Sequence, residues 1–389
     1  MERSVRGRQE YAALMGAEPE EALAEIRRRS PQMYYSVVES AFGGPLAHAE
    51  LGRAARELVT VATLAAVGGA EPQLAVHVRT ALRNGIAPAE LRALAEHLSV
   101  YAGFPRALNA LAVVDEVLAD AGLRGPVPLR RIDTGDHETV VAHLGDRGPA
   151  VVLLHALGLD WRMWEPVMAT LSAGRRVFAY DIRGHGHAAG HAARFTMADA
   201  AADLIGVLDA CGLDRAHVVG LSYGGGIAQT AAVARPERFA SLSLLATTDH
   251  PFDAFEGRAR SAEDEGMAAQ VVPSLTRWFT PAALAANGWG VRYAREQVLR
   301  GNTADWAGTW RAFGGLDVKG RLDGFDAPTL VLAGELDAST TPEIMRAIAD
   351  RIPGSQYREL PATPHMQSLE QPELVAAALD EFLPAERSR

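Results

Sequence analysis

The amino-acid sequence predicts two domains of different fold class, an all-α N-terminal domain and a larger α/β C-terminal domain. From residue 18 to residue 118, apolar residues recur every three or four positions, which is the helical period, and no strand-like run interrupts them. From residue 129 onward, short β-branched runs alternate with helical stretches, a pattern typical of a largely parallel sheet covered on both faces. The length of 389 residues also exceeds what one hydrophobic core usually organises.

The boundary between the domains is marked by glycine and proline. Gly122, Gly125, Pro126 and Pro128 fall close together, so we place the helical domain at residues 1–120, a linker at 121–128 and the α/β domain at 129–389. Inside the helical domain, Pro88 is expected to begin a new helix, because a proline fits a first turn, where its missing N–H is no loss.

The α/β domain contains seven candidate strands and one insertion. The strands are expected at residues 139–144, 150–154, 176–180, 216–220, 241–245, 329–333 and 357–360. Residues from about 247 to 318 break the alternation with helical and aromatic residues, and we interpret them as a lid inserted before the last strands.

Composition restricts the function classes. A net charge of −10 argues against general affinity for nucleic acid or for anionic membranes. The first sixteen residues lack the apolar core of a secretory signal, and no apolar run approaches the roughly 20 residues that span a bilayer. The one cysteine, Cys211, excludes an intrachain disulfide, a CxxC redox pair and a thiolate zinc cluster. We therefore expect a cytoplasmic protein that acts on small molecules.

The strongest local signal is the sequence Gly-Leu-Ser-Tyr-Gly at residues 220–224, which follows an apolar strand and precedes a helical run. A sharp strand-to-helix turn of this kind holds its serine in a strained conformation with the hydroxyl exposed. The alternative is a glycine-rich turn without chemistry. The flanking strand and helix favour a nucleophile at Ser222.

A serine hydroxyl needs an imidazole to accept its proton and a carboxylate to orient that imidazole. The acid candidate is Asp337, just past a strand end, and Glu335 is its nearest competitor. The base candidate is His365, the one histidine that follows Asp337 in the chain. Serine, acid and histidine then occur in the order found in α/β-hydrolases.

The oxyanion formed on attack requires backbone N–H donors that are already in place. One should come from Tyr223, and the other from Leu157 in the turn at residues 155–158, although that turn could be merely a tight connection. We interpret residues 181–186 as a structural turn near the site.

Residues from about 129 to 384 resemble the 3-oxoadipate enol-lactone hydrolases of the α/β-hydrolase superfamily. The matching segments are Leu157-Gly158 with Trp164, residues 180–186 and 220–225, Arg277-Trp278-Phe279-Thr280-Pro281, Asp337 and His365 with residues 370–372. The segment at 277–281 is the most discriminating.

The resemblance to the enol-lactone hydrolases implies that the lid arginine Arg258 could meet a substrate carboxylate. Trp278 is a second candidate substrate contact, although lid tryptophans usually serve packing. His155-Ala156 and Phe255 depart from the family pattern, which leaves the acyl preference open.

Residues 18–118 resemble the carboxymuconolactone decarboxylase family, with matching blocks at residues 56–66, 73–77, 81–85, 101–105 and 109–110. The resemblance implies an all-helical fold that assembles as a homo-oligomer, a trimer or a hexamer. Some members are thiol peroxidases with a CxxC pair, and the absence of cysteine from this region excludes that activity.

Glu57 and His77 match the acid and histidine positions of the decarboxylase fold. Decarboxylation of a γ-carboxylated butenolide needs no metal or other cofactor, because the electrons left by CO₂ spread into the lactone carbonyl. His77 could then be the general acid and Glu57 its orienting partner, or both could be a satisfied buried pair. Arg56 is a candidate carboxylate binder, with Arg79 and His97 as further possibilities, although helix arginines are usually solvated.

The two resemblances point to consecutive steps of protocatechuate breakdown in the β-ketoadipate pathway. We hypothesise a bifunctional 4-carboxymuconolactone decarboxylase and 3-oxoadipate enol-lactone hydrolase. The alternative is a serine hydrolase of another ester or lactone, in which the helical domain is only an oligomerisation scaffold. A non-enzymatic binding protein is disfavoured because no member of the expected triad is missing.

Overall fold

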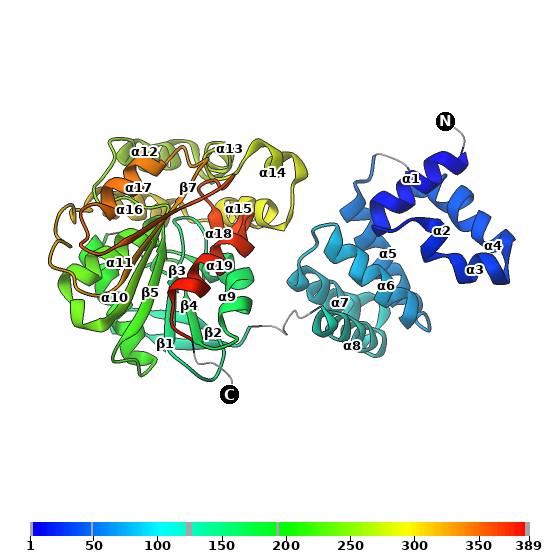
Figure 1. The fold of residues 1–389 in the computed structure, drawn as a ribbon, viewed down its shortest axis with the longest axis horizontal. Coiled ribbons are helices and arrows are strands. Elements are labelled where there is room, and N and C mark those ends of the chain that lie inside the picture. The colour runs from blue at the N-terminus through cyan, green and yellow to red at the C-terminus, as the bar shows by residue number, and fades with distance from the viewer. Residues whose placement is uncertain (1–2, 48–49, 122–126, 192–193, 386–389) are drawn as a thin grey trace. The chain divides into compact units, whose positions relative to one another are not determined.

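A computed structural model describes residues 3–47, 50–121, 127–191 and 194–385 of the chain. The chain divides into two compact units, Met1–Pro126 and Val127–Arg389, which are treated separately below. The first is helical and the second carries a parallel sheet with helices around it, so both predicted fold classes are confirmed (Figure 1). Residues 122–126 of the predicted linker lie outside the described residues.

The helical unit has two small hydrophobic cores. One is formed by helices α5 to α8 around Val61, Val78 and Val114, and the other by Tyr11 and Phe42 near the N-terminus. The elements are α1 (Arg3–Met15), α2 (Pro19–Ala22), α3 (Ala24–Arg29), α4 (Pro31–Tyr35), the π-helical η1 (Ser36–Phe42), η2 (Pro45–Ala47), α5 (Arg53–Val67), α6 (Glu71–Arg83), α7 (Pro88–Ala102) and α8 (Phe104–Asp120).

Helix α7 begins at Pro88 as predicted, whereas α1 lies before the expected helical region. The buried face of α1 consists of Gly7, Tyr11 and Leu14. Gly7 allows the helix to approach η1 closely, since a Cβ there would lie 1.9 Å from the carbonyl oxygen of Val38. Because glycine has no apolar side chain, a glycine at a buried position interrupts the helical repeat of apolar residues. This interruption explains why α1 was not predicted from the sequence.

The second unit is built on an eight-stranded sheet in its described residues, with the order β1-β2-β4-β3-β5-β6-β7-β8. The strands are β1 (Leu129–Asp133), β2 (Glu138–Leu144), β3 (Ala150–Leu154), β4 (Arg176–Tyr180), β5 (Ala216–Leu221), β6 (Phe239–Leu245), β7 (Thr329–Gly334) and β8 (Gln356–Leu360). The pairs β1–β2 and β2–β4 are antiparallel. All later pairs in this order, from β4–β3 to β7–β8, are parallel, so the carboxyl ends of these strands lie at one edge of the sheet.

Strand β1 was not predicted. Four of its five residues are exposed and Ile132 is the buried one, so it shows no apolar alternation. It is recognised only through its pairing with β2, and its charged side chains are typical of a sheet edge.

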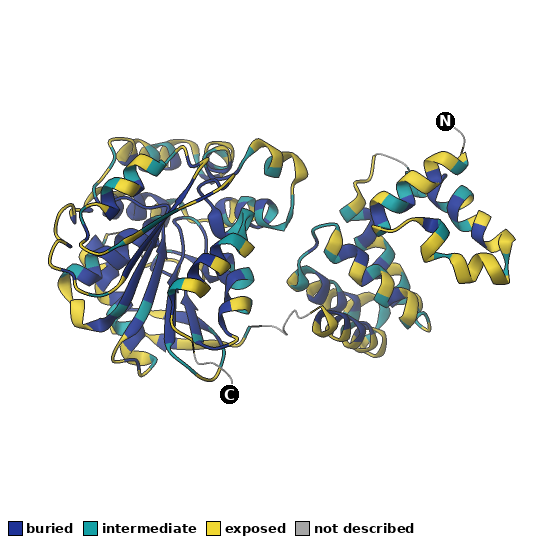
Figure 2. Cartoon of the chain, in the orientation of Figure 1, coloured by how far each residue is buried: buried dark blue, intermediate teal, exposed yellow. Residues whose placement is uncertain are grey.

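Helices cover both faces of the sheet, with α9 (Glu165–Leu171) and α19 (Pro372–Phe382) on one face and α10 (Met197–Ala210) and α11 (Tyr223–Ala234) on the other (Figure 1). Burial is deepest in the central strands, and every residue of β3 is buried (Figure 2). The remaining short elements are η3 (Trp161–Trp164), η4 (Gly186–Ala188), η5 (Pro236–Arg238), α17 (Pro342–Ala349) and α18 (Gln367–Glu370).

The lid lies between β6 and β7, where an insertion at residues 247–318 was expected. It comprises α12 (Ala254–Glu265), α13 (Met267–Trp278), α14 (Pro281–Ala286), α15 (Trp289–Arg300) and α16 (Thr303–Gly314). In the described part of the chain, no helix combines the length and apolar character needed to cross a bilayer.

Candidate active site

Ser222 lies at the turn between strand β5 and helix α11, with φ 55° and ψ −115°. Positive φ is unfavourable for a residue with a side chain, so surrounding contacts must maintain this conformation. The Ser222 N–H donates to the carbonyl of Leu245 at 2.9 Å. The Ser222 carbonyl accepts from the Gly226 N–H at 3.1 Å and from the Thr247 hydroxyl at 2.7 Å. These bonds hold the serine at the carboxyl edge of the sheet.

Two glycines make the turn at Ser222 possible. A Cβ on Gly220 would lie 2.4 Å from the carbonyl oxygen of Gly224. A Cβ on Gly224 would lie 2.5 Å and 2.7 Å from the carbonyl oxygens of Leu154 and His155. Because these contacts are with backbone atoms, a side chain at Gly220 would force the start of α11 away from the end of β5, and one at Gly224 would push the turn away from strand β3 and the loop after it.

The structure brings Ser222, His365 and Asp337 together, although they are far apart in sequence. His365 Nε2 lies 3.1 Å from Ser222 Oγ, and His365 Nδ1 lies 2.8 Å from Asp337 Oδ2. His365 and Asp337 are buried. With the Nδ1 proton donated to the carboxylate, Nε2 is free to accept the serine proton, which is the geometry that nucleophilic catalysis requires.

The Asp337 carboxylate is fully hydrogen-bonded. Its Oδ1 accepts from the N–H groups of Ser339 and Thr340 at 2.8 and 3.0 Å, and its Oδ2 accepts from the Thr340 hydroxyl at 2.7 Å. Burial alone would raise the pKa of Asp337, but the charge of His365 and the bonds from His365 and Thr340 lower it overall. The group is therefore held as a carboxylate facing the imidazole.

Thr340 was missed by the sequence analysis, although the signal was present. An aspartate that accepts N–H bonds from the second and third residues after it forms a local turn, and Asp337 stands three residues before Thr340. Glu335, the competing acid candidate, instead accepts from the Ala362 N–H at 2.7 Å, and no contact joins it to His365 in the described residues.

The two expected oxyanion donors lie beside the nucleophile. Tyr223 is the first residue of α11, and Leu157 lines the same pocket as Ser222. In the described part of the chain, neither the N–H of Leu157 nor that of Tyr223 has an acceptor. Both donors are thus available to an oxygen bound at Ser222, as an oxyanion hole requires.

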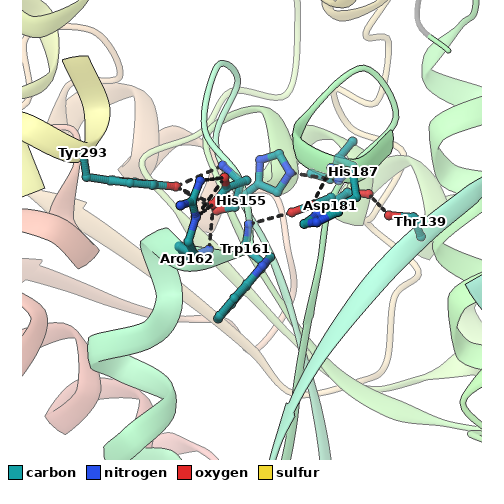
Figure 3. Close-up of polar contacts among 9 residues, drawn as sticks. Thr139, His155, Trp161, Arg162, Asp181, His187 and Tyr293 are labelled. Atoms are coloured by element: carbon teal, nitrogen blue, oxygen red, sulfur yellow. Dashed lines mark hydrogen bonds and ion pairs between the residues drawn. The ribbon is translucent and has the colours of Figure 1, made fainter. Parts of the chain in front are cut away.

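The loop that carries Leu157 is tied to the turn at residues 181–186, which we had interpreted as structural. The N–H of Ile182 donates to His155 Nε2 at 2.9 Å, and the N–H of Trp161 donates to Asp181 at 3.0 Å (Figure 3). His155 is fully buried and does not line the pocket. Of the two departures from the family pattern, only Phe255 therefore borders the substrate space.

The pocket at Ser222 is walled mainly by the lid. Its lining combines aromatic and apolar side chains with a few polar ones: Leu157, Ser222, Thr248, Phe252, Phe255, Arg258, Arg277, Trp278, Trp310, Phe313, Ser339, Thr340, His365 and Met366. Trp278 lies where a substrate contact was expected, and its carbonyl also accepts from the Met366 N–H at 3.0 Å. The lid is therefore bonded directly to the residue that follows His365.

Two lid arginines, Arg258 and Arg277, line the pocket without an acidic partner in the described residues. The Arg258 guanidinium lies over the ring of Trp310, 4.7 Å from its centre, and Arg277 reaches the Ser274 hydroxyl at 3.4 Å. Burial lowers the pKa of Arg258, and burial together with the Arg258 charge lowers the pKa of Arg277 to about 10. Both stay positive near neutral pH, so the pocket favours an anion. The sequence analysis singled out Arg258 but gave Arg277 no role of its own.

In the helical unit, Glu57 and His77 are brought together as expected. His77 Nδ1 lies 2.9 Å from Glu57 Oε2, across helices α5 and α6. The Glu57 side chain is 1% exposed and that of His77 is 23% exposed. The imidazole is thus partly accessible to solvent, and the buried carboxylate fixes its orientation.

The arginines expected to bind carboxylate in the helical unit already have acidic partners. Arg56 Nη2 lies 2.7 Å from Glu10, a residue of α1 that the sequence analysis did not consider. The Nε and Nη1 atoms of Arg56 are buried, and no described residue accepts a hydrogen bond from them. Arg79 lies 3.4 Å from Asp120, and His97 is exposed beside Tyr101.

One cluster outside these sites has a composition that could suit a metal ion, namely Asp136, His137 and Asp203. The Arg183 guanidinium lies 2.5 Å from Asp136 and 2.7 Å from Asp203. A cation is thus already paired with both carboxylates, and the cluster is better explained as an ion-pair network.

Comparison with protein families gives one match in each unit. Residues 149–372, more than half of the chain, match the family described as alpha/beta hydrolase fold. Residues 32–116 match the carboxymuconolactone decarboxylase family, so this match begins later than the residue 18 expected from the sequence.

Known proteins similar to the second unit include an enzyme and two solved structures. The 3-oxoadipate enol-lactonase 1 of Acinetobacter baylyi is 30% identical over 59% of this chain and 86% of its own. The crystal structure of the enol-lactonase from Burkholderia xenovorans LB400 has a TM-score of 0.63 and 28% identity, over 65% of this chain and 99% of that one. A malate-bound thermophilic esterase from Thermogutta terrifontis has a TM-score of 0.61 and 29% identity, over 66% and 97%.

The close packing at Gly224 gives a first prediction. Gly224→Ala should destabilise the protein by about 2 kcal/mol and lower kcat for ester hydrolysis about 100-fold, because the added methyl displaces the turn from the oxyanion loop. Denaturant unfolding and hydrolysis of phenyl acetate measure the two effects. Gly257→Ala is the matched control, since a Cβ there meets no atom within 4 Å. Unchanged kcat in Gly224→Ala would contradict the prediction.

The Thr340 hydroxyl gives a prediction about pH. The folded-state pKa of Asp337 is depressed, so its carboxylate contributes stability above an unfolded pKa of about 3.9, and this stability is lost as the pH falls through the folded value. Thr340→Val should raise the folded pKa and cost roughly 1.5 kcal/mol at neutral pH.

The cost of Thr340→Val should shrink as the pH falls through the depressed folded-state pKa of Asp337, because the carboxyl group then becomes protonated in both proteins. Denaturant unfolding across this range measures it. Thr309→Val is the matched control, because the buried Thr309 hydroxyl has no partner in the part of the chain that the structure describes, and its removal should cost nothing at any pH. A pH-independent cost for Thr340→Val would refute the assigned role.

Proposed function

Because the chain belongs to the α/β-hydrolase fold family, we propose that its second unit is a serine hydrolase that opens a lactone carrying a carboxylate group. The observation that carries this proposal is the contact of Ser222, His365 and Asp337 at a pocket containing two guanidinium groups that have no acidic partner among the described residues. The first supplies the chemistry of acyl transfer, and the second selects an anionic substrate.

In the proposed reaction, Ser222 Oγ attacks the lactone carbonyl while His365 Nε2 takes its proton. The N–H groups of Leu157 and Tyr223 stabilise the oxyanion. The intermediate collapses with release of the ring oxygen as an enolate, which takes the proton held by His365 and becomes a ketone. Neutral His365 then removes a proton from the water that attacks the acyl-enzyme, and collapse of the second intermediate returns this proton to Ser222 Oγ and releases the new carboxylate.

The substrate class follows from the lining of the pocket. Its aromatic walls suit a small planar ring, and Arg258 and Arg277 would bind a carboxylate on that ring. The similarity to two enol-lactonases supports an enol-lactone, and 3-oxoadipate enol-lactone is the substrate we propose. An enolate is a good leaving group, so this lactone needs no metal to assist its opening.

For the helical unit we propose decarboxylation of 4-carboxymuconolactone, whose product is that enol-lactone. The family match and the Glu57–His77 contact support this step. The electrons of the broken carbon–carbon bond move through the ring double bond into the lactone carbonyl as CO₂ leaves. His77 would then donate a proton to carbon, with Glu57 holding the imidazole in place.

The complete proposal is a bifunctional enzyme for consecutive steps of the β-ketoadipate pathway, acting on lactones without a cofactor. We also propose that it forms a homo-oligomer through the helical unit, where Val100, Tyr101 and Phe104 are large exposed apolar side chains. The second candidate retains the hydrolase but gives it another ester or lactone, with the helical unit as an oligomerisation scaffold. The acidic partners of Arg56 and Arg79 favour that candidate.

Separate loss of two activities tests the bifunctional proposal. Ser222→Ala should abolish lactone opening, by about 10⁶-fold in kcat, and leave CO₂ release intact. His77→Ala should lower CO₂ release by about 100-fold or more and leave lactone opening intact. Spectrophotometry of each lactone with CO₂ detection measures both, and Glu96→Ala at an exposed position of α7 is the control.

Each outcome of this test discriminates between the candidates. If Ser222→Ala retained lactone opening, the assigned nucleophile would be wrong. If the unaltered enzyme released no CO₂ from 4-carboxymuconolactone but opened lactones, the scaffold candidate would replace the bifunctional one.

The two lid arginines predict how specificity depends on charge. Arg258→Met and Arg277→Met should each raise KM for the carboxylate-bearing lactone about 10- to 100-fold, because each removes a charge-assisted hydrogen bond. KM for neutral phenyl acetate should stay within about twofold. Arg260→Met is the matched control, since Arg260 is exposed on the helix that carries Arg258 and is paired with Glu256. Equal losses on both substrates would show that the arginines only maintain the lid.

A further inference from the structure

The loop that carries Leu157 is held at both ends by side chains outside the triad. At its start, His155 accepts the Ile182 N–H through Nε2 and donates from Nδ1 to the Ala156 carbonyl at 2.8 Å. Burial, with the nearby His185, lowers the pKa of His155 to about 3, so the ring is neutral and Nε2 can accept. The start of the loop is thereby fixed to the turn after strand β4.

The other end of the loop is held by the lid. The Tyr293 hydroxyl, on helix α15, accepts the Asp160 N–H at 3.1 Å and donates to Asp160 Oδ1 at 2.8 Å. Figure 3 shows Tyr293 reaching Arg162 from one side of the loop, with His155 and Asp181 on the other. The turn that presents the Leu157 N–H lies between these two attachments.

The contact between Tyr293 and Asp160 is buried and its proton positions are fixed. Burial and the Asp160 charge raise the pKa of Tyr293 well above its ordinary value, so the phenol keeps its proton. Burial alone would raise the pKa of Asp160, but hydrogen bonds and the charge from Arg162 lower it, so the carboxylate stays ionised. The phenol is therefore a donor to Asp160 and an acceptor from its N–H at the same time.

Arg162 is the second partner of Asp160 and contributes less to the position of the lid. It forms a bidentate pair with the Asp160 carboxylate from two residues further along the same loop. This local pair stiffens the loop, and the Arg162 guanidinium also lies 5.4 Å from the centre of the Tyr293 ring. Two side chains of α15 contact Asp160, namely Tyr293 and Gln297, whose amide nitrogen donates to Asp160 Oδ2 at 3.0 Å. The Tyr293 hydroxyl is the one of the two that bonds both the backbone N–H and the carboxylate of Asp160.

We propose that Tyr293 is a positioning residue of the oxyanion hole, through which the lid sets the place of the Leu157 N–H. This inference rests on the proposed serine hydrolase. The lid then has two roles, since it supplies the pocket wall and also holds one of the two donors that stabilise the transition state. If the lid moved away from Asp160, Ser222 would keep its position, but the Leu157 N–H would no longer be aligned in the oxyanion hole.

Tyr293→Phe tests the proposal in the full-length enzyme, because it keeps the ring that stacks on Trp289 and removes only the hydroxyl. We expect kcat for phenyl acetate to fall about tenfold, which is a part of the effect of deleting an oxyanion donor. The inhibition constant of a trifluoromethyl ketone, which forms an oxyanion on Ser222, should rise by the same factor. KM and the inhibition constant of hexanoate, which leaves the hole empty, should change less than about twofold.

Two further variants make the result decisive. Tyr357→Phe removes a phenol hydroxyl that does not line the pocket and donates to Glu359 at 3.0 Å. This variant should leave all four constants unchanged. Asp160→Asn keeps an oxygen and an N–H for Tyr293 but weakens the pair with Arg162, and should cost less than Tyr293→Phe. If Asp160→Asn cost as much or more, the local ion pair rather than the lid would position the loop, and the proposal would be wrong.

The ratio of the two inhibition constants separates misalignment from unfolding, since a loss of folded enzyme lowers the apparent kcat but leaves both inhibition constants unchanged. Equal changes in both, or an unchanged kcat, would overturn the proposal. If Ser222→Ala still hydrolysed phenyl acetate, the proposed function itself would fail, which is a different result from an unaffected Tyr293→Phe.

Discussion

The site depends on the close approach of two backbone segments, the turn at Ser222 and the loop after strand β3. Gly224 packs directly against the carbonyls of Leu154 and His155, and no other residue would fit there. This contact sets the N–H groups of Leu157 and Tyr223 beside the same serine. Strain at Ser222 is maintained because neighbouring strands and Thr247 hold its backbone on both sides. The imidazole and the carboxylate can only act on a nucleophile that this packing has already placed.

Charge in the lid follows a different rule from charge elsewhere in the second unit. Buried cations usually have an acidic partner, as Arg183 has in Asp203 and Arg175 has in Asp380. Arg258 and Arg277 are exceptions in the described residues, and they face the pocket rather than the core. Their partial burial is unfavourable until an anion binds, so an anionic ligand would stabilise the lid. The same lid is bonded through Trp278 to Met366 and through Tyr293 to Asp160, so in the proposed enzyme one element would contact both the substrate charge and the loops around Ser222.

The sequence was sufficient to predict those features of the fold and the site that depend on a local pattern of residues. The turn at Ser222, seven strands and the chain order of the three site residues follow from contiguous motifs. Partners contributed by distant segments could not be read in the same way. Tyr293 contacts Asp160 across 133 positions and Glu10 contacts Arg56 across 46, and neither spacing has a periodic signature. Strand β1 was not predicted for a related reason, since it is recognised by its pairing with β2 rather than by a pattern of apolar residues of its own. Thr340 is the one omission that local turn chemistry would have revealed.

The two units treat their arginines differently, and this bears on what each can bind. In the helical unit, Arg56 and Arg79 already face carboxylates of the chain, so an incoming dianion would have to compete with Glu10 or Asp120. In the hydrolase unit, Arg258 and Arg277 have no such competitor among the described residues. A substrate carboxylate would therefore meet less competition there than beside Arg56 or Arg79. In the Glu57–His77 pair, the imidazole is 23% exposed and its Nδ1 is already bonded to Glu57, so a ligand could approach only the Nε2 side of the ring.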